Sequence, residues 1–161
     1  MPGLTDEEYH RLLEFRTGLR RFLRWSEGEA ARAGLSPAQH QLLLAIRGRS
    51  AQGVPGEAEG AGSPRGPRIG ELAEELLLRH HSVVELVDRA EAAGLVQREG
   101  DPTDHRYVRV ILTRLGARRL EQLATSHLEE LRRLAPRFQR LWEGLEPAGP
   151  NDGRHQDLFD T

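Results

Sequence analysis

The sequence predicts a mainly α-helical fold that carries one small β-hairpin. Two long segments, 5–32 and 113–134, repeat apolar residues at helical spacing. Between them, two short helical segments precede a pair of β-branched runs that are joined by dense turn residues. The chain has 161 residues, so these elements fit one small domain with helical extensions.

Composition narrows the class of protein. Hydrophobic residues make up 37 % of the chain and charged residues 30 %, which suits a chain that buries apolar surface against a second copy of itself. There is no cysteine, which excludes disulfides and thiolate zinc sites. No apolar run approaches the roughly 20 residues of a membrane span. The acidic N-terminus does not read as a secretory signal, so we expect a cytoplasmic protein.

The N-terminal third predicts two helices and a loop. Thr5 is a candidate N-cap for the first helix, with Glu8 completing a capping box. Glycine at position 34 ends that helix, and Ser36 and Pro37 begin a second one that extends to about Arg47. Residues 48–67 are rich in glycine and proline, and we expect a flexible loop there.

The middle of the chain predicts two short helices and a hairpin. Helical spacing resumes at Ile69 and continues in a second short helix whose inward residues are Val83, Leu86, Val87 and Ala90. Residues 95–99 and 107–112 read as strands, with turn residues at 100–104 between them. Two short helices followed by a hairpin form a winged helix-turn-helix, whose second helix enters the DNA major groove.

The last third predicts a long helix from Thr113, which Pro136 is expected to break or restart. The long helices expose more apolar surface than a monomer could cover, so we expect a homodimer with two-fold symmetry. The predicted regions are an N-terminal dimerisation helix (1–34), a winged helix-turn-helix lobe (35–113, with the flexible loop 48–67), C-terminal dimerisation helices (114–146) and a disordered tail (147–161).

Four segments in order resemble the MarR family of winged-helix regulators. They are residues 71–76, 82–89 with 92–96, 101–106 and 110–116, and with the flanking helices the resemblance covers about residues 5–145. The resemblance implies a sequence-specific DNA-binding transcriptional regulator, a repressor that acts as a homodimer on a pseudo-palindromic operator. It also implies that a small aromatic or acidic ligand relieves DNA binding.

Three positions depart from the family pattern. Leu77 occupies the helix-turn-helix turn, where the family has glycine, and a positive φ would resist leucine. We therefore expect a reshaped or longer turn. Histidines 80 and 81 stand before Ser82, where the family begins its recognition helix with a small polar residue. The wing carries His105 and Arg106 in place of two arginines.

The predicted DNA contacts lie on the outward face of the second short helix and on the wing. The start of the helix can reach base edges and phosphate. Glu85 is placed to accept from a cytosine amino group, or else only to pair with Arg89 one turn later. Arg106 is placed to enter a narrow minor groove, with Asp104 directing a wing arginine. The full set is His80, His81, Ser82, Val84, Glu85, Arg89, Asp104, His105 and Arg106.

Positive charge is concentrated in one segment of the chain. All 23 basic residues are arginine, yet the formal net charge is −2. Residues 104–119 hold five arginines and one acidic residue, a net charge of +4. The sequence therefore predicts a basic patch around the wing that the overall charge conceals.

Candidate ligand contacts are Arg16, Arg20, Trp25 and His40, which offer cations, an aromatic wall and a polar group. The alternative is that Trp25 belongs to the dimer core and the arginines are solvated. No metal or other cofactor is predicted. His80 and His81 are adjacent on a helix and point about 100° apart, so they do not share one ion. The other five histidines are scattered, and only the fold would gather them: His10, His40, His105, His127 and His155.

Two other classes of protein are alternatives to a DNA-binding regulator. A winged-helix module that binds protein and not DNA would share the same pattern. An enzyme is disfavoured, because the sequence has no nucleophile elbow, phosphate loop, HExxH motif or paired-carboxylate arrangement. Salt-dependent binding to promoter DNA separates the regulator from the protein-binding module.

Overall fold

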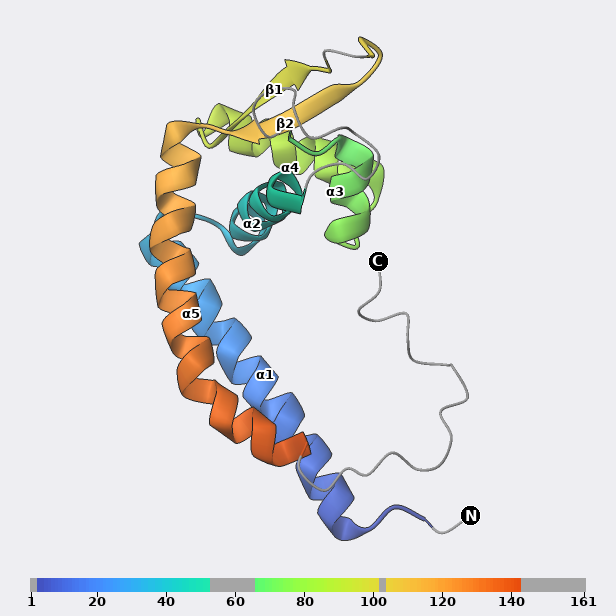
Figure 1. Ribbon diagram of the computed structural model, residues 1–161, viewed down its shortest axis with the longest axis vertical. Coiled ribbons are helices and arrows are strands. Elements are labelled where there is room, and N and C mark those ends of the chain that lie inside the picture. The colour runs from blue at the N-terminus through green and yellow to red at the C-terminus, as the bar shows by residue number, and fades with distance from the viewer. Residues whose placement is uncertain (1–2, 53–65, 102–103, 143–161) are drawn as a thin grey trace. The chain divides into compact units, whose positions relative to one another are not determined.

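The computed structural model describes residues 3–52, 66–101 and 104–142, so most of the predicted loop and the whole predicted tail lie outside the described residues. The elements, in order, are α1 (Asp6–Arg32), α2 (Pro37–Gln52), α3 (Ile69–Glu75), α4 (His80–Ala92), β1 (Val96–Gly100), β2 (Val108–Leu112) and α5 (Arg114–Trp142) (Figure 1). This mainly helical fold with one hairpin confirms the predicted fold class. Contacts divide the chain into two compact units, Met1–Phe22 with Glu129–Thr161 and Leu23–Leu128.

The predicted helix starts are confirmed by their hydrogen bonds. The backbone N–H of Thr5 donates to Glu8 Oε2 at 2.6 Å, and the N–H of Glu8 donates to Thr5 Oγ1 at 3.3 Å. Ser36 and Gln39 exchange the same pair of bonds at 2.9 and 3.2 Å. These capping boxes satisfy N–H groups that the first turn of a helix leaves unbonded.

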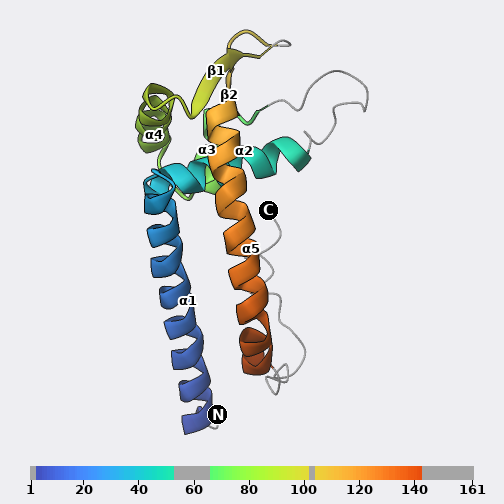
Figure 2. The ribbon, with the colours of Figure 1, turned by 90° about the vertical axis from the view of Figure 1, so that its left-hand side faces the viewer.

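The larger unit, Leu23–Leu128, packs α2, α3 and α4 beneath the hairpin, whose tip extends beyond the helices (Figures 1 and 2). β1 pairs antiparallel with β2 from Val96↔Leu112 to Gly100↔Val108, and Arg68 adds one bridge to Arg109. The core is aliphatic, and its largest side chains are almost fully buried. They are Leu42, Leu43, Ile46, Leu72, Val83, Val87, Leu95, Val96 and Val110.

The second helix is longer than the sequence predicts. The expected end near Arg47 is wrong, because α2 continues to Gln52. Arg49 Nε donates to Glu75 Oε2 of α3 at 2.8 Å, and the Ser50 hydroxyl donates to the carbonyl of Ile46 at 2.7 Å. These contacts stabilise one more turn that contains Gly48, a residue that disfavours helix by itself.

The turn between α3 and α4 keeps the usual conformation despite its leucine. Leu77 has φ of +53°, so the expectation of a reshaped or longer turn is wrong. The N–H of Leu78 donates to the carbonyl of Ala73 at 3.0 Å, and the N–H of Leu77 donates to that of Glu74 at 3.2 Å. Packing of the flanking helices overrides the local preference of leucine.

We expect Leu77→Gly to stabilise the protein. A leucine in the left-handed region costs about 1–2 kcal/mol of stability. A glycine removes this strain but costs roughly 0.5–1 kcal/mol itself, because it loses more conformational entropy on folding. Leu77 is 92 % exposed, so its replacement loses no packing. The expected gain in unfolding free energy is about 0.5–1 kcal/mol, measured by chemical denaturation. Leu77→Ala keeps the strain and removes the same apolar surface, and an equal gain in that variant would contradict the strain explanation.

The smaller unit pairs the first part of α1 with the last part of α5. The rings of Phe15 and Phe138 meet edge to face, with centroids 5.8 Å apart, and Phe138 lies over Gly18. The predicted break at Pro136 is wrong, because α5 runs through that residue to Trp142. The packing of Phe138 and the burial of Leu141 hold the part of the helix that follows the missing N–H group.

None of the described helices combines the length and the apolar character that a membrane crossing requires.

Candidate nucleic-acid interface

Helix α4 has one buried face and one open face. The predicted inward residues are confirmed, with Val83, Val87 and Ala90 at 0 % exposure and Leu86 at 3 %. Five of the predicted DNA-contact residues lie on the opposite, open face of the helix. His80, His81, Glu85 and Arg89 are exposed, and Ser82 is half-buried at the first turn. The sixth predicted residue of this helix, Val84, is also half-buried.

The first turn of α4 presents free backbone donors. Arg79 is the N-cap residue, in an extended conformation (φ −70°, ψ 147°), and its side chain makes no capping bond. Its carbonyl accepts from the N–H groups of Ser82 and Val83. Among the described residues, the N–H groups of His80 and His81 have no acceptor, so they are available to an anion.

The acid in the middle of the open face is available to a ligand. Glu85 and Arg89 are one helical turn apart, but in the described part of the chain neither forms an ion pair. The helix itself is held to the hairpin from another side, where Arg98 of β1 pairs with Asp88 at 2.6 Å and with Glu91. Glu85 therefore does not form the ion pair with Arg89 that the sequence left open as an alternative.

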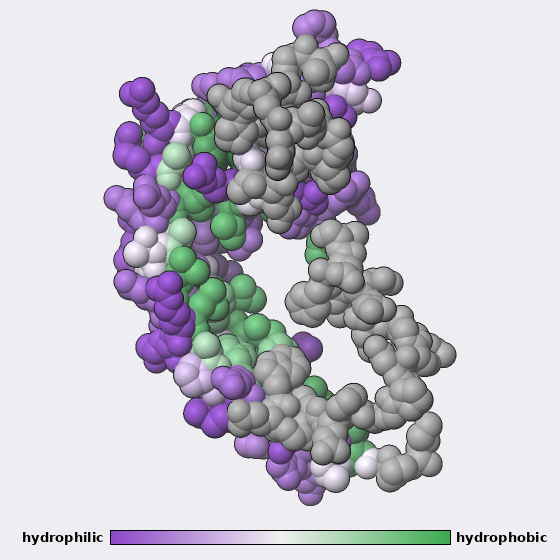
Figure 3. Space-filling model, in the orientation of Figure 1, coloured by the Kyte–Doolittle hydropathy of each residue, from purple (hydrophilic) through white to green (hydrophobic). Residues whose placement is uncertain are grey.

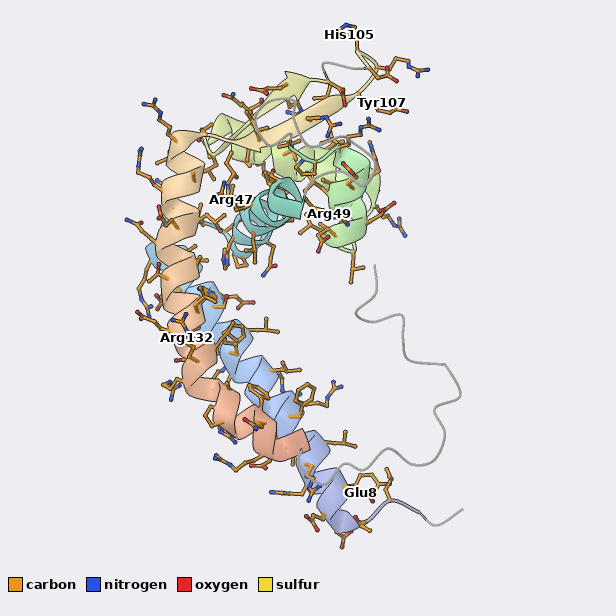
Figure 4. All side chains as sticks on the ribbon, in the orientation of Figure 1. Glu8, Arg47, Arg49, His105, Tyr107 and Arg132 are labelled. Atoms are coloured by element: carbon orange, nitrogen blue, oxygen red, sulfur yellow. The ribbon has the colours of Figure 1, made fainter. Side chains whose placement is uncertain are left out.

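The wing directs an arginine outward, as the sequence predicts. His105 lies at the end of the hairpin, beyond Tyr107 (Figure 4). Asp104 accepts from Arg106 at Nε (3.0 Å), at Nη2 (2.7 Å) and at the backbone N–H (3.1 Å). These bonds hold the pKa of the Asp104 carboxyl below its ordinary value, so the pair stays charged. The Arg106 side chain is 83 % exposed.

The predicted basic patch is smaller than five arginines. Arg109 turns inward and is 4 % exposed, with Nε donating to the buried carboxylate of Asp101 at 2.7 Å. Arg119 donates to the carbonyl of Gly34 at 3.1 Å. The role of Asp101 was not predicted from the sequence, because an aspartate in a turn is common for local reasons. No pattern in β2 marks Arg109 as buried, because alternation is broken there by two consecutive buried residues, Arg109 and Val110.

Comparison with known proteins agrees with this geometry. A model of the MarR family matches residues 60–106, the segment that holds α3, α4, β1 and the start of the wing. A regulator from Bacillus subtilis, the uncharacterized HTH-type transcriptional regulator YsmB, is 36 % identical over 70 residues. That match covers 44 % of this chain and 48 % of YsmB, so the chain spans about half the length of this relative.

Solved structures extend the likeness to most of the chain. AbsC, a MarR family transcriptional regulator from Streptomyces coelicolor, has a TM-score of 0.64 at 23 % identity, covering 91 % of this chain and 95 % of AbsC. CouR, a transcriptional repressor solved bound to a 23-mer DNA duplex, has a TM-score of 0.60 at 25 % identity. The match covers 86 % of this chain and 92 % of CouR. Residues 60–106 therefore resemble the MarR family, and the fold of the chain is that of MarR family structures. Its relatives here are described as regulators of transcription and not as enzymes.

Two of the four candidate ligand residues, Trp25 and His40, meet around a third side chain. The His127 ring lies 4.9 Å from that of Trp25 and 4.8 Å from that of His40, measured between centroids. A pocket of about 210 Å³ beside them is lined by Leu23, Ser26, Glu27, Pro37, Ala38, His40 and Gln41. Arg16 and Arg20, the other two candidates, belong to the smaller unit and are exposed.

His127 has a defined hydrogen-bond pattern. Nδ1 lies 2.7 Å from the carbonyl oxygen of Leu123, so it carries a proton and donates. In the neutral ring, Nε2 therefore accepts from the Ser26 hydroxyl, which lies 2.7 Å away. The fold thus gathers two of the scattered histidines, which sequence spacing alone did not indicate. Within the described ranges, no three histidine or acidic side chains group as metal ligands, and His155 lies outside them.

We expect His40 to make the stability of the protein depend on pH. Burial, and next the neighbouring His127, lower the pKa of His40 below its ordinary value of 6.5. Below pH 6.5 the unfolded chain therefore binds this proton more readily than the folded chain does. The contribution of neutral His40 is complete above pH 6.5 and is lost as the pH falls toward the lowered value.

His40→Gln removes this titration. The unfolding free energy of the wild type should fall more steeply between pH 7.5 and 5.5 than that of the variant, as measured by urea denaturation at each pH. His10→Gln is the matched control, because His10 is exposed, and its profile should follow the wild type. Parallel profiles for the wild type and His40→Gln would contradict the assignment.

Proposed function

We propose that this chain is a DNA-binding transcriptional regulator that acts as a homodimer on a pseudo-palindromic operator, and that it represses. The observation that carries the proposal is the open face of α4. Its inner face is fully used by the core, while His80, His81, Glu85 and Arg89 are exposed, and in the described part of the chain no ion pair occupies the charged members. A helix of this kind fits the major groove, and base edges there are read by such side chains.

The wing supplies the second contact. Arg106 is exposed and is directed by Asp104, which suits insertion into the adjacent minor groove. Asp104 and His105 complete the predicted wing contacts. Both relatives of known structure named above are transcriptional regulators, and the one called a repressor was solved on a DNA duplex. These titles support the proposal of DNA binding and of repression for this chain.

The proposed homodimer accounts for the exposed face of α1. Tyr9, Leu12, Leu13 and Leu19 lie on one side of this helix and are 39–58 % exposed. Figure 3 shows a hydrophobic strip along the part of α1 that faces the viewer. An exposed apolar strip on a protein surface marks a contact with another molecule. A two-fold interface uses the same strip on both copies. Two copies of α4 then predict half-sites about one helical turn apart, roughly 34 Å.

The proposed effector is a small aromatic or acidic molecule. His40 lines the 210 Å³ pocket of the larger unit, which has room for about a single ring, because drug-sized sites begin near 300 Å³. A ligand there relieves DNA binding only if it favours one conformation over another. Adding benzoate to the assay below tests this part, and an unchanged affinity would contradict it.

The test is a mobility-shift titration with the DNA next to the protein's own gene at two salt concentrations. We expect affinity to fall steeply as salt rises, because phosphate contacts release counterions. Arg106→Ala should cost about 1–3 kcal/mol of binding free energy and make the salt dependence shallower. Arg133→Ala is the matched control, since Arg133 is also an exposed arginine in an ion pair with a nearby acid, and it should bind as the wild type does.

Two results would contradict the proposal. Equal affinity of Arg106→Ala and the wild type would remove the wing from the interface. A folded homodimer that binds no promoter-proximal DNA at either salt concentration would favour the winged-helix module that binds protein.

A further inference from the structure

The base of the wing contains a buried carboxylate that joins three parts of the chain. Asp101 directly follows β1 and is 0 % exposed. Its Oδ2 accepts from Arg109 Nε of β2 at 2.7 Å and from Arg68 Nη2, just before α3, at 3.3 Å. Its Oδ1 accepts from the backbone N–H of Asp104 at 3.3 Å. One side chain therefore connects both strands of the hairpin to the start of the helix-turn-helix.

The two arginines that pair with Asp101 each make a further contact. Arg109 Nη1 donates to the carbonyl of Gly66 at 3.1 Å, and the N–H of Val110 donates to that of Pro67 at 2.9 Å. The guanidinium of Arg68 lies 4.0 Å from the centroid of the Tyr107 ring. The segment that precedes α3 is thus fastened to β2, and a residue of the wing is stacked against it.

The chain of contacts continues to the exposed arginine. Asp101 holds the backbone of Asp104, and the carboxylate of Asp104 holds Arg106 at three positions. Arg106 is also 6.0 Å from the Tyr107 ring. The side chain of Arg106, 83 % exposed, is the outer end of this sequence of contacts, where DNA would lie, and the carboxylate of Asp101 is its buried end.

We propose that Asp101 is a positioning residue that orders the wing before DNA arrives, so that Arg106 is presented in its binding direction. This inference rests on the proposed function. A buried ion pair is seldom more stable than well-packed apolar side chains of the same size, so its presence here is explained by the conformation that it fixes. Ordering a loop at the moment of binding weakens affinity, and a wing ordered in advance avoids that cost.

The first experiment uses the free protein. Asp101→Asn keeps the shape of the side chain and removes its charge, and we expect the amides of Asp104 and Arg106 to exchange with solvent about tenfold faster, as measured by hydrogen-exchange NMR. Amides of α2 should keep their wild-type rates. Glu130→Gln is the matched control, since it removes the carboxylate of an ion pair on α5, and it should leave the wing amides unchanged.

The second experiment is a double-mutant cycle on operator affinity. Asp101→Asn should weaken binding about fivefold to tenfold in the wild type, but less than about twofold when Arg106→Ala is already present, because coupled residues are not additive. Should Asp101→Asn fold poorly, Asp101→Leu with Arg109→Leu replaces the pair by apolar side chains, keeps the melting temperature near that of the wild type and still weakens binding.

Each result has a distinct meaning. Unchanged exchange of the wing amides would overturn the positioning role, whatever the affinity. Equal losses of affinity with and without Arg106 would also overturn it, because a general loss of stability acts on both backgrounds alike. Failure of the wild-type protein to bind any DNA would overturn the proposed function and the DNA role of Asp101, while the exchange data would still decide whether Asp101 orders the wing.

Discussion

Replacing Leu12 and Leu19 by glutamate should convert the protein to a monomer and weaken operator binding at least about 100-fold. The two residues are seven positions apart, on one face of α1, and are 52 % and 39 % exposed. Two charges at these positions would have to be desolvated in a two-fold interface that brings both copies of the face together. A monomer also loses the gain from binding two half-sites at once, which is about 10²–10⁴.

The measurement is sedimentation equilibrium, followed by the mobility-shift titration. Arg21→Glu is the matched control, because Arg21 lies nine residues after Leu12 and therefore about half a turn around the helix. It is exposed and should leave the dimer intact. Circular dichroism should show wild-type helix content in both proteins, since the leucines are not part of the core of one chain. A dimer that persists in the double glutamate variant would place the interface elsewhere.

Gly116→Ala should be strongly destabilising, at about 3 kcal/mol or more. A Cβ atom at this position would lie 2.0 Å from the carbonyl oxygen of Leu95 and 3.0 Å from its carbonyl carbon. Both are backbone atoms, and the same oxygen accepts from the N–H of Thr113 at 3.0 Å and from its hydroxyl at 3.1 Å. The start of α5 therefore cannot move away from β1 without breaking these bonds.

Thermal denaturation should show the melting temperature of Gly116→Ala lowered by roughly 6–12 °C, given about 2–4 °C per kcal/mol at this chain length. Gly48→Ala is the matched control, because it is the same amino-acid change at another helical position. Gly48 lies inside α2 with open space around the added methyl group, so we expect a gain of about 0.5–1 kcal/mol. A Gly116→Ala variant as stable as the wild type would show that the contact with Leu95 relaxes at little cost.

The order of elements was predictable because it depends on local patterns. Apolar spacing located α1, α4 and α5, and turn chemistry located the hairpin. The caps at Thr5 and Ser36 depend on side chains three residues apart, which the sequence displays directly. The inward face of α4 followed from the same helical spacing.

The errors occur where distant residues decide the outcome. Leu77 adopts a positive φ because α3 and α4 impose it, and α2 gains a turn because Arg49 reaches Glu75. Arg109 was counted with the basic patch, although Asp101 draws it inside. The contact between His40 and His127 joins residues that are far apart in the sequence, and no local pattern announces such a pair. Tertiary packing overrides local preference at each of these positions.

Pro136 has a consequence for how the end of α5 unfolds. Proline has no N–H group, so the carbonyl of Arg132 loses its helical partner, and the hydrogen-bond ladder is interrupted one and a half turns before the helix ends. The residues after the proline form their helix with support from the contact of Phe138 with Phe15 of α1 and from the burial of Leu141. The terminal turns of α5 are therefore a separate, weakly cooperative segment whose order depends on the aromatic contact with its neighbour and not on the helix from which it continues.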